Sequence, residues 1–178
     1  MTNTFKQLVE KTAPCPPATT PITSAEAAEL MKRFQKVFGV IGVDFNFSRH
    51  GGLHDRLTDS RNKPPISKCE FDHVMSSFVK KMSMQLYNDV GDIQARKVEA
   101  RGKRTENIRP NNYEYAILSR STGVNIVLAL QPNPDRSSKY RVRVNIVTII
   151  RKPGFKVNQG ETVMVEGVEY TPTWVIVD

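Results

Sequence analysis

The sequence predicts an α+β domain in which N-terminal helices pack on one face of a curved antiparallel β-sheet. Apolar residues repeat at helical spacing in the first half of the chain and alternate at strand spacing in the second half. The 178 residues, 39% of them hydrophobic, suit a single packed core. We therefore expect a flexible tail over residues 1–22 and one domain over residues 23–178, with no second core.

The first half of the chain contains two predicted helices. Residues 1–22 include four prolines among threonines and alanines, which favours an extended tail. A capping-box pattern begins at Thr23, and apolar residues then recur on one helical face as far as Gly39. A second capping-box pattern begins at Ser67 and precedes an amphipathic helix that extends to about Leu86.

The second half of the chain changes from charged residues to strand-forming residues. Residues 88–112 lack an apolar pattern and are rich in arginine and lysine, so we expect a long basic loop there. The pattern beyond it predicts strands at residues 113–119, 124–131, 139–151, 162–165, 168–171 and 173–177. Glu166 and Gly167 are expected to form a hairpin turn, and helices followed by a meander of strands indicate the α+β layout.

Charge and cysteine content narrow the class of protein. Lys and Arg total 26 against 18 Asp and Glu, and this excess attracts polyanions. The two cysteines, Cys15 and Cys69, lack metal-ligand spacing, so we expect neither a disulfide nor a zinc site, and a reducing compartment. No apolar run is long enough to span a bilayer. We expect a soluble cytoplasmic protein without cofactor, metal or membrane contact.

The predicted strand over residues 139–151 separates apolar from basic side chains. Strict alternation places Tyr140, Val142, Val144, Ile146 and Ile150 toward the helices. It places Arg141, Arg143, Asn145 and Arg151 on the other face, about 7 Å apart, which approximates the spacing of phosphates along a nucleic-acid strand. The neighbouring strand offers no acidic residue on that face. We favour a ligand-binding surface over a solvated face whose arginines neutralise carboxylates.

A second basic cluster precedes the second helix and consists of His50, His54, Arg56, Arg61, Lys63 and Lys68. The two histidines are four residues apart, but no third metal ligand accompanies them. A histidine here could act as general base on a ribose 2′-hydroxyl, with arginines stabilising the charged transition state, as in metal-independent ribonucleases. The alternative is that these residues only bind phosphate.

Two sequence runs resemble a known fold. The run RHGGLHDRLTDSRNKPPIS, and the later run that begins VNIVLAL and ends YRVRVNIVTIIRKPGFK, look like phage relatives of the barnase–EndoU–colicin–RelE ribonuclease fold over roughly residues 24–157. In that family helices precede a curved antiparallel sheet, and RNA lies across its open face. The resemblance implies that these residues lie near RNA: His50 or His54, Arg56, Arg61, Thr148 and Arg151.

The proline-rich tail and basic loop add a narrower resemblance. Together with this fold they are similar to the chimallin C type of RNA-binding protein, which is associated with the nuclear shell of large nucleus-forming phages. That resemblance implies binding of single-stranded or messenger RNA with little sequence preference, with a phage shell protein as a further partner. It also implies a place in the cytoplasm of the bacterial host cell, associated with a phage replication compartment. A complete acid–base pair is not evident, which favours binding over cleavage.

The sequence therefore predicts a non-catalytic RNA-binding protein, with DNA as a further candidate ligand. The residues expected to contact RNA are His54, Arg56, Arg61, Lys63, Lys68, Arg96, Lys97, Arg101, Lys103, Arg104, Arg141, Arg143, Arg151, Lys152 and Lys156. The first alternative is a metal-independent endoribonuclease that leaves a 2′,3′-cyclic phosphate. Its candidate catalytic residues are His50, His54, Arg56 and Thr148. The second alternative is a structural or virion protein.

Overall fold

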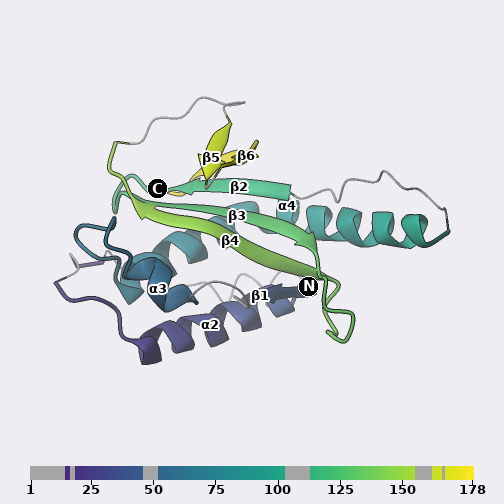
Figure 1. The fold of residues 1–178 in the computed structure, drawn as a ribbon, viewed down its shortest axis with the longest axis horizontal. Helices are drawn as coiled ribbons and strands as arrows, with labels where there is room; N and C mark the ends of the chain where they lie inside the picture. The colour runs from purple at the N-terminus through teal and green to yellow at the C-terminus, as the bar shows by residue number, and fades with distance from the viewer. Residues whose placement is uncertain (1–14, 17–18, 46–51, 103–112, 155–161, 166) are drawn as a thin grey trace.

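The computed structural model of the chain describes residues 15–16, 19–45, 52–102, 113–154, 162–165 and 167–178. Its helices are α2 (Ser24–Gly39), α3 (Leu53–Leu57) and α4 (Lys68–Gly102). Its strands are β1 (Val43–Phe45), β2 (Tyr113–Leu118), β3 (Val124–Pro132), β4 (Val142–Arg151), β5 (Val163–Val165), β6 (Val168–Tyr170) and β7 (Thr173–Ile176) (Figure 1). None of the described helices is both long enough and apolar enough to cross a membrane.

Five of the strands form one open sheet in the order β1-β4-β3-β2-β7, and β5 and β6 form a separate hairpin. The predicted α+β class is confirmed, but the sheet is mixed rather than antiparallel. The central strands β2, β3 and β4 pair antiparallel, whereas β1 pairs parallel to β4 and β7 pairs parallel to β2. Parallel neighbouring strands need a crossover connection. The edge strands β1 and β7 therefore cannot belong to a simple meander with the strands that they pair with.

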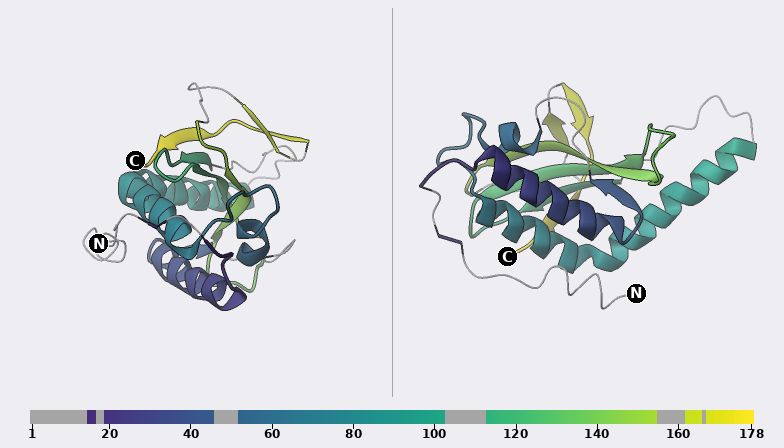
Figure 2. Two further views of the ribbon diagram at one scale, coloured as in Figure 1. Left: turned by 90° about the vertical axis from the view of Figure 1, so that its left-hand side faces the viewer. Right: turned by 90° about the horizontal axis from the view of Figure 1, so that it is seen from below.

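The helices pack on one face of the sheet, and the β5–β6 hairpin lies on the other side (Figure 2). The predicted capping box starts α2: the Thr23 side chain accepts a hydrogen bond from the backbone of Glu26, whose carboxylate accepts one in return. Phe34 of α2 is fully buried, with its ring centroid 5.7 Å from that of Phe45 on β1 and 5.8 Å from that of Phe71 on α4. These aromatic contacts join both long helices to the sheet.

Helix α4 spans 35 residues and extends through much of the predicted basic loop. The prediction of a loop over residues 88–102 is wrong because Val90 and Ile93, each 3% exposed, continue the apolar stripe beyond Leu86. In addition, Asp89 accepts a hydrogen bond from the hydroxyl of Tyr115 on β2. Burial and this carboxylate raise the pKa of Tyr115 well above its usual value. Residues 103–112 of the predicted loop lie outside the described residues.

Strand β4 contains a β-bulge that changes which side chains face the helices. Val127 of β3 pairs with Thr148, but the next residue, Leu128, pairs with Ile146, so Val147 is an additional residue in the ladder. A side chain from another element stabilises the bulge: Arg56 of α3 donates a hydrogen bond to the carbonyl of Val147 at 2.7 Å. The prediction of strict alternation through residue 151 is therefore wrong beyond residue 147.

The N-terminal segment is attached to the domain at two points. Cys15 forms a disulfide with Cys69 in the first turn of α4, with Cα atoms 5.6 Å apart, and Ile22 is buried with only 4% exposure. The expectation that these cysteines stay unpaired is wrong, because the fold joins positions separated by 54 residues in sequence. Of the predicted flexible tail over residues 1–22, residues 1–14 lie outside the described residues.

Candidate nucleic-acid interface

We call the sheet surface opposite α2 and α4 the outer face. Strand alternation and the bulge in β4 determine which side chains lie on it. The pairing registers place these side chains on it: Ala116 and Leu118 of β2, Asn125, Val127, Ala129 and Gln131 of β3, Arg143, Asn145, Thr148 and Ile150 of β4, and Trp174 of β7. Ala116, Val127 and Ile150 give it an apolar region, whereas Asn145 and Thr148 bring polar groups to the middle of β4. The same registers place the acidic residues Asp44 of β1 and Glu114 of β2 on this face, beside Arg143 and Ala129.

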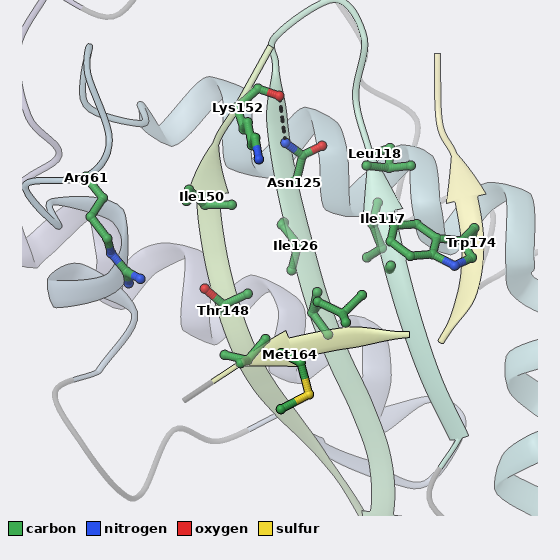
Figure 3. Close-up of a pocket in the computed structure, with 14 residues that line it drawn as sticks. Arg61, Ile117, Leu118, Asn125, Ile126, Thr148, Ile150, Lys152, Met164 and Trp174 are labelled. Carbon is green, nitrogen blue, oxygen red and sulfur yellow. Dashed lines mark hydrogen bonds between the residues drawn. The ribbon is translucent and has the colours of Figure 1, made fainter. Parts of the chain in front are cut away.

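A pocket of about 250 Å³ lies between the outer face and strand β5. Its walls are mostly apolar, with Met164 of β5 on one side and Trp174 of β7 on another (Figure 3). Four lining residues bring polar groups to it: Arg61, Asn125, Thr148 and Lys152. The described lining residues include no His, Asp or Glu, so they hold two cations, an amide and a hydroxyl but no general base.

Arg61 places a fixed cation at the edge of this pocket. Its Nε lies 3.0 Å from Oδ1 of Asp59, and its Nη2 lies 2.8 Å from Oδ2. These hydrogen bonds lower the pKa of Asp59, so the pair stays ionised at neutral pH. The Arg61 side chain is 60% exposed and extends toward Thr148 of β4 (Figure 3). It is therefore oriented by its partner and accessible to an anionic ligand.

Lys152 follows β4 directly and places a second cation beside the same pocket. Its side chain is exposed, while its backbone is fixed because its N–H donates to the Gly123 carbonyl at 2.8 Å. Three residues that were predicted to lie near a ligand are thus brought together: Arg61 lies beside Thr148 and Lys152, which are more than 80 residues later in the sequence.

The predicted row of three arginines on the outer face is not present. Arg143 is on this face, but it lies beside Asp44 of β1 in the register, and its guanidinium donates to the Gln131 amide oxygen in the amide orientation that satisfies both groups. Arg141 is exposed just before β4. Arg151 lies on the opposite face because the bulge reverses the alternation.

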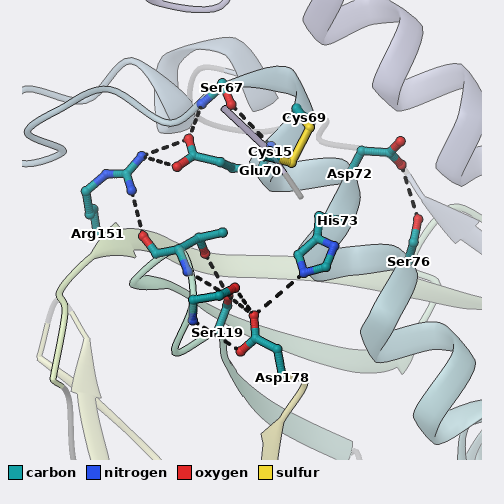
Figure 4. Close-up of a disulfide and its surroundings, with 12 residues drawn as sticks. Cys15, Ser67, Cys69, Glu70, Asp72, His73, Ser76, Ser119, Arg151 and Asp178 are labelled. Atoms are coloured by element: carbon teal, nitrogen blue, oxygen red, sulfur yellow. Dashed lines mark hydrogen bonds and ion pairs between the residues drawn. A yellow bond between two sulfur atoms is a disulfide. The ribbon is translucent and has the colours of Figure 1, made fainter. Parts of the chain in front are cut away.

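Arg151 is instead the centre of a buried cluster. Its side chain is 7% exposed, and both of its contacts to the Glu70 carboxylate, which is 6% exposed, are shorter than 3 Å (Figure 4). Its Nε donates to the carbonyl of Pro64 and its Nη1 to that of Thr122, and the Nη2 that contacts Glu70 also lies 3.1 Å from the carbonyl oxygen of Pro65. The prediction that Arg151 binds RNA is wrong, because its guanidinium faces the protein interior and already has five acceptor atoms.

The other predicted contact residues are dispersed. Arg56 supports the bulge, and His54 lies on α3 with its Nδ1 3.3 Å from a carboxylate oxygen of Asp55 rather than in the pocket. Lys68 forms an ion pair with Glu29 of α2, which raises the pKa of Lys68. Lys63 is exposed in the loop before α4. The predictions for Arg96, Lys97, Arg101, Lys103, Arg104, Lys156 and His50 concern side chains outside the part of the chain that the structure describes.

A polar cluster that the sequence did not indicate surrounds Asp178. Its carboxylate accepts hydrogen bonds from the hydroxyls of Ser119 and Ser121 and lies 3.6 Å from Nε2 of His73 (Figure 4). The His73 side chain is 18% exposed. Both hydroxyls point to the carboxylate, not to the imidazole, so no base is aligned on a nucleophile as in a hydrolase triad. The residues come from three distant segments, which explains why no sequence pattern indicated them.

This cluster predicts a specific pH dependence. Burial raises the pKa of Asp178, but hydrogen bonds from Ser119, Ser121 and the Arg120 backbone outweigh it and lower the pKa below its usual value. Such a carboxylate stabilises the fold above its unfolded-state pKa, and the contribution disappears as the pH falls through the folded-state pKa. The D178N variant should therefore lose less unfolding free energy than the wild type between pH 7 and about pH 3. Urea denaturation at both pH values checks this, and parallel losses in the two proteins would contradict it.

No protein-family model, curated protein or solved structure matches this chain.

Proposed function

We propose that this protein binds single-stranded RNA across the outer face of its sheet and does not cleave it. One observation supports this most directly: an apolar pocket on an open sheet surface is bordered by two cations, Arg61 and Lys152. Unpaired nucleotides present a flat apolar base and a phosphate side by side, and proteins bind them with stacking surfaces next to basic side chains. The net charge of +8 favours the encounter with such a polyanion.

The proposal of binding without cleavage is supported by the groups that line the described pocket, which include no general base. Cleavage at a 2′-hydroxyl needs a general base within hydrogen-bond reach of that group. His54 contacts Asp55 and does not line the pocket, and Thr148 and the two cations are poor bases at neutral pH. The available groups can position a phosphate and a base, which is sufficient for a binding module.

The first test removes both pocket cations. The R61A/K152A double variant should bind a single-stranded RNA of about twelve nucleotides roughly tenfold more weakly at low salt. Each phosphate contact contributes about 0.7 to the slope of log affinity against log salt, so the slope should become shallower by about 1.4. Fluorescence anisotropy titrations at several salt concentrations measure both quantities.

The control keeps the net charge of the test variant. K32A/K36A removes two exposed lysines from α2, on the side of the molecule opposite the outer face, and should leave both affinity and slope nearly unchanged. If both double variants weaken binding equally, the RNA affinity depends only on the net charge of the protein, and the outer face is not the binding site. Electrophoresis of the recovered RNA should show intact strands, and a ladder of products would contradict the non-catalytic assignment.

A further inference from the structure

The pocket has a fixed pattern of hydrogen-bonding groups in addition to its cations. Asn125 is 8% exposed, and its Nδ2 donates to the carbonyl of Gly123 at 3.2 Å and to the carbonyl of Lys152 at 3.1 Å. An amide nitrogen has two hydrogens, so both are used and the amide cannot rotate without losing them. Oδ1 of Asn125 therefore serves as a fixed acceptor at the pocket wall, and it points away from Lys152 (Figure 3).

The turn that accepts one of these hydrogen bonds is itself tightly fixed. Gly123 has a φ of 70°, and a Cβ at this position would lie 2.9 Å from the Pro153 side chain. Only glycine combines this conformation with so close an approach. The β2–β3 turn is thereby held against the end of β4, which keeps both carbonyl partners of Asn125 in place.

The bulge supplies a second polar group. If the strand had no bulge, strict alternation would place Val147 and not Thr148 on the outer face. The hydroxyl of Thr148 is instead presented to the pocket, where it can accept or donate a hydrogen bond. Around it, Val127, Ile150 and Trp174 leave an apolar surface suited to the face of an aromatic ring.

We infer that this pocket holds one unpaired base that carries an exocyclic amino group, adenine or cytosine in preference to uracil. The amino group donates to Oδ1 of Asn125, the ring lies on the apolar wall, and the adjoining phosphates are bound by Arg61 and Lys152. Uracil presents a carbonyl oxygen where adenine and cytosine present the amino group, so it leaves the amide oxygen without a donor. This inference rests on the proposed function and adds base selectivity at one position to sequence-tolerant phosphate contacts.

The test uses oligonucleotides that differ in one amino group. Three uridine tracts are compared at equal length and salt: all uridine, one central adenosine, and one central purine riboside, which keeps the purine ring but lacks the amino group. We expect the adenosine tract to bind about fivefold more tightly than the purine riboside tract. The N125A variant should abolish this ratio, because it removes the acceptor of the amino group.

The matched control is N145A, because Asn145 is an exposed amide on the outer face that does not line the pocket. It should retain the wild-type ratio. Thermal melting checks that each variant is folded, and the comparison of the adenosine and purine riboside tracts on the wild-type protein keeps the test decisive if N125A does not fold. Equal binding of all three tracts, still weakened by R61A/K152A, would overturn the base selectivity and leave the proposed function intact. Failure to bind any tract would overturn both.

Discussion

Replacing Glu70 with alanine is expected to lower the unfolding free energy by about 3–5 kcal/mol, because it leaves the charge of Arg151 buried without its partner. The two side chains are 6% and 7% exposed, and the arginine joins the end of β4 to the loop before α4. In a domain of this size each kcal/mol lowers Tm by roughly 2–4 °C. Urea denaturation and thermal melting measure the loss.

The Glu29–Lys68 ion pair provides the control, because its side chains are 64% and 42% exposed. The E29A variant should change the unfolding free energy by less than about 1 kcal/mol, since exposed pairs are screened by solvent. The E70A/R151A double variant should be less destabilised than the sum of the two single variants, because neither charge is then left alone. If E70A and E29A cost the same, the Arg151–Glu70 pair is not shielded from water as the structure shows.

Reduction of the Cys15–Cys69 disulfide is expected to produce the second large loss of stability. The link joins positions 54 residues apart, and closing a loop of that length in the unfolded chain is worth about 4 kcal/mol in the chain-entropy account. Denaturation with and without a dithiol reductant should show a loss of roughly 2–4 kcal/mol in the wild type.

The C15S/C69S variant separates the disulfide from other effects of the reductant. It should match the reduced wild type in stability and should not respond to reductant. Thiol labelling of the denatured wild type should modify neither cysteine before reduction and both afterwards. Because disulfides are rare in reducing cytoplasm, the cysteines no longer support the expectation of such a compartment. Free thiols in the unreduced protein would contradict the bond.

Local features of the fold were predictable because they depend on neighbouring residues. The capping boxes at Thr23 and Ser67 and the β5–β6 hairpin are all present as expected. Features that depend on distant contacts were not predictable. The continuation of α4 depends on the packing of Val90 and Ile93, and the parallel pairing of β1 and β7 depends on the whole sheet.

The candidate site was predictable in part for the same reason. Arg61 and Lys152 were predicted from the charge pattern, and Thr148 was implied by the family resemblance; all three line one pocket. Arg56 and Arg151 also lie in basic segments, but their guanidinium groups contact other parts of the protein. Arg56 contacts the carbonyl of Val147, and Arg151 contacts the carboxylate of Glu70. An arginine in a sequence does not reveal whether a carboxylate or carbonyl from a distant segment will reach it.

The single additional residue in β4 makes the length of this strand as important as its composition. If β4 paired with β3 without the bulge, strict alternation would continue to the end of the strand, the guanidinium of Arg151 would turn to solvent, and Thr148 would move under the helices. Deleting Val147 itself would instead remove the bulge and leave Thr148 and Arg151 on their present faces. This deletion should therefore be tolerated better than the insertion of one residue between Thr148 and Arg151, which would exchange the interior and the surface at the end of the strand.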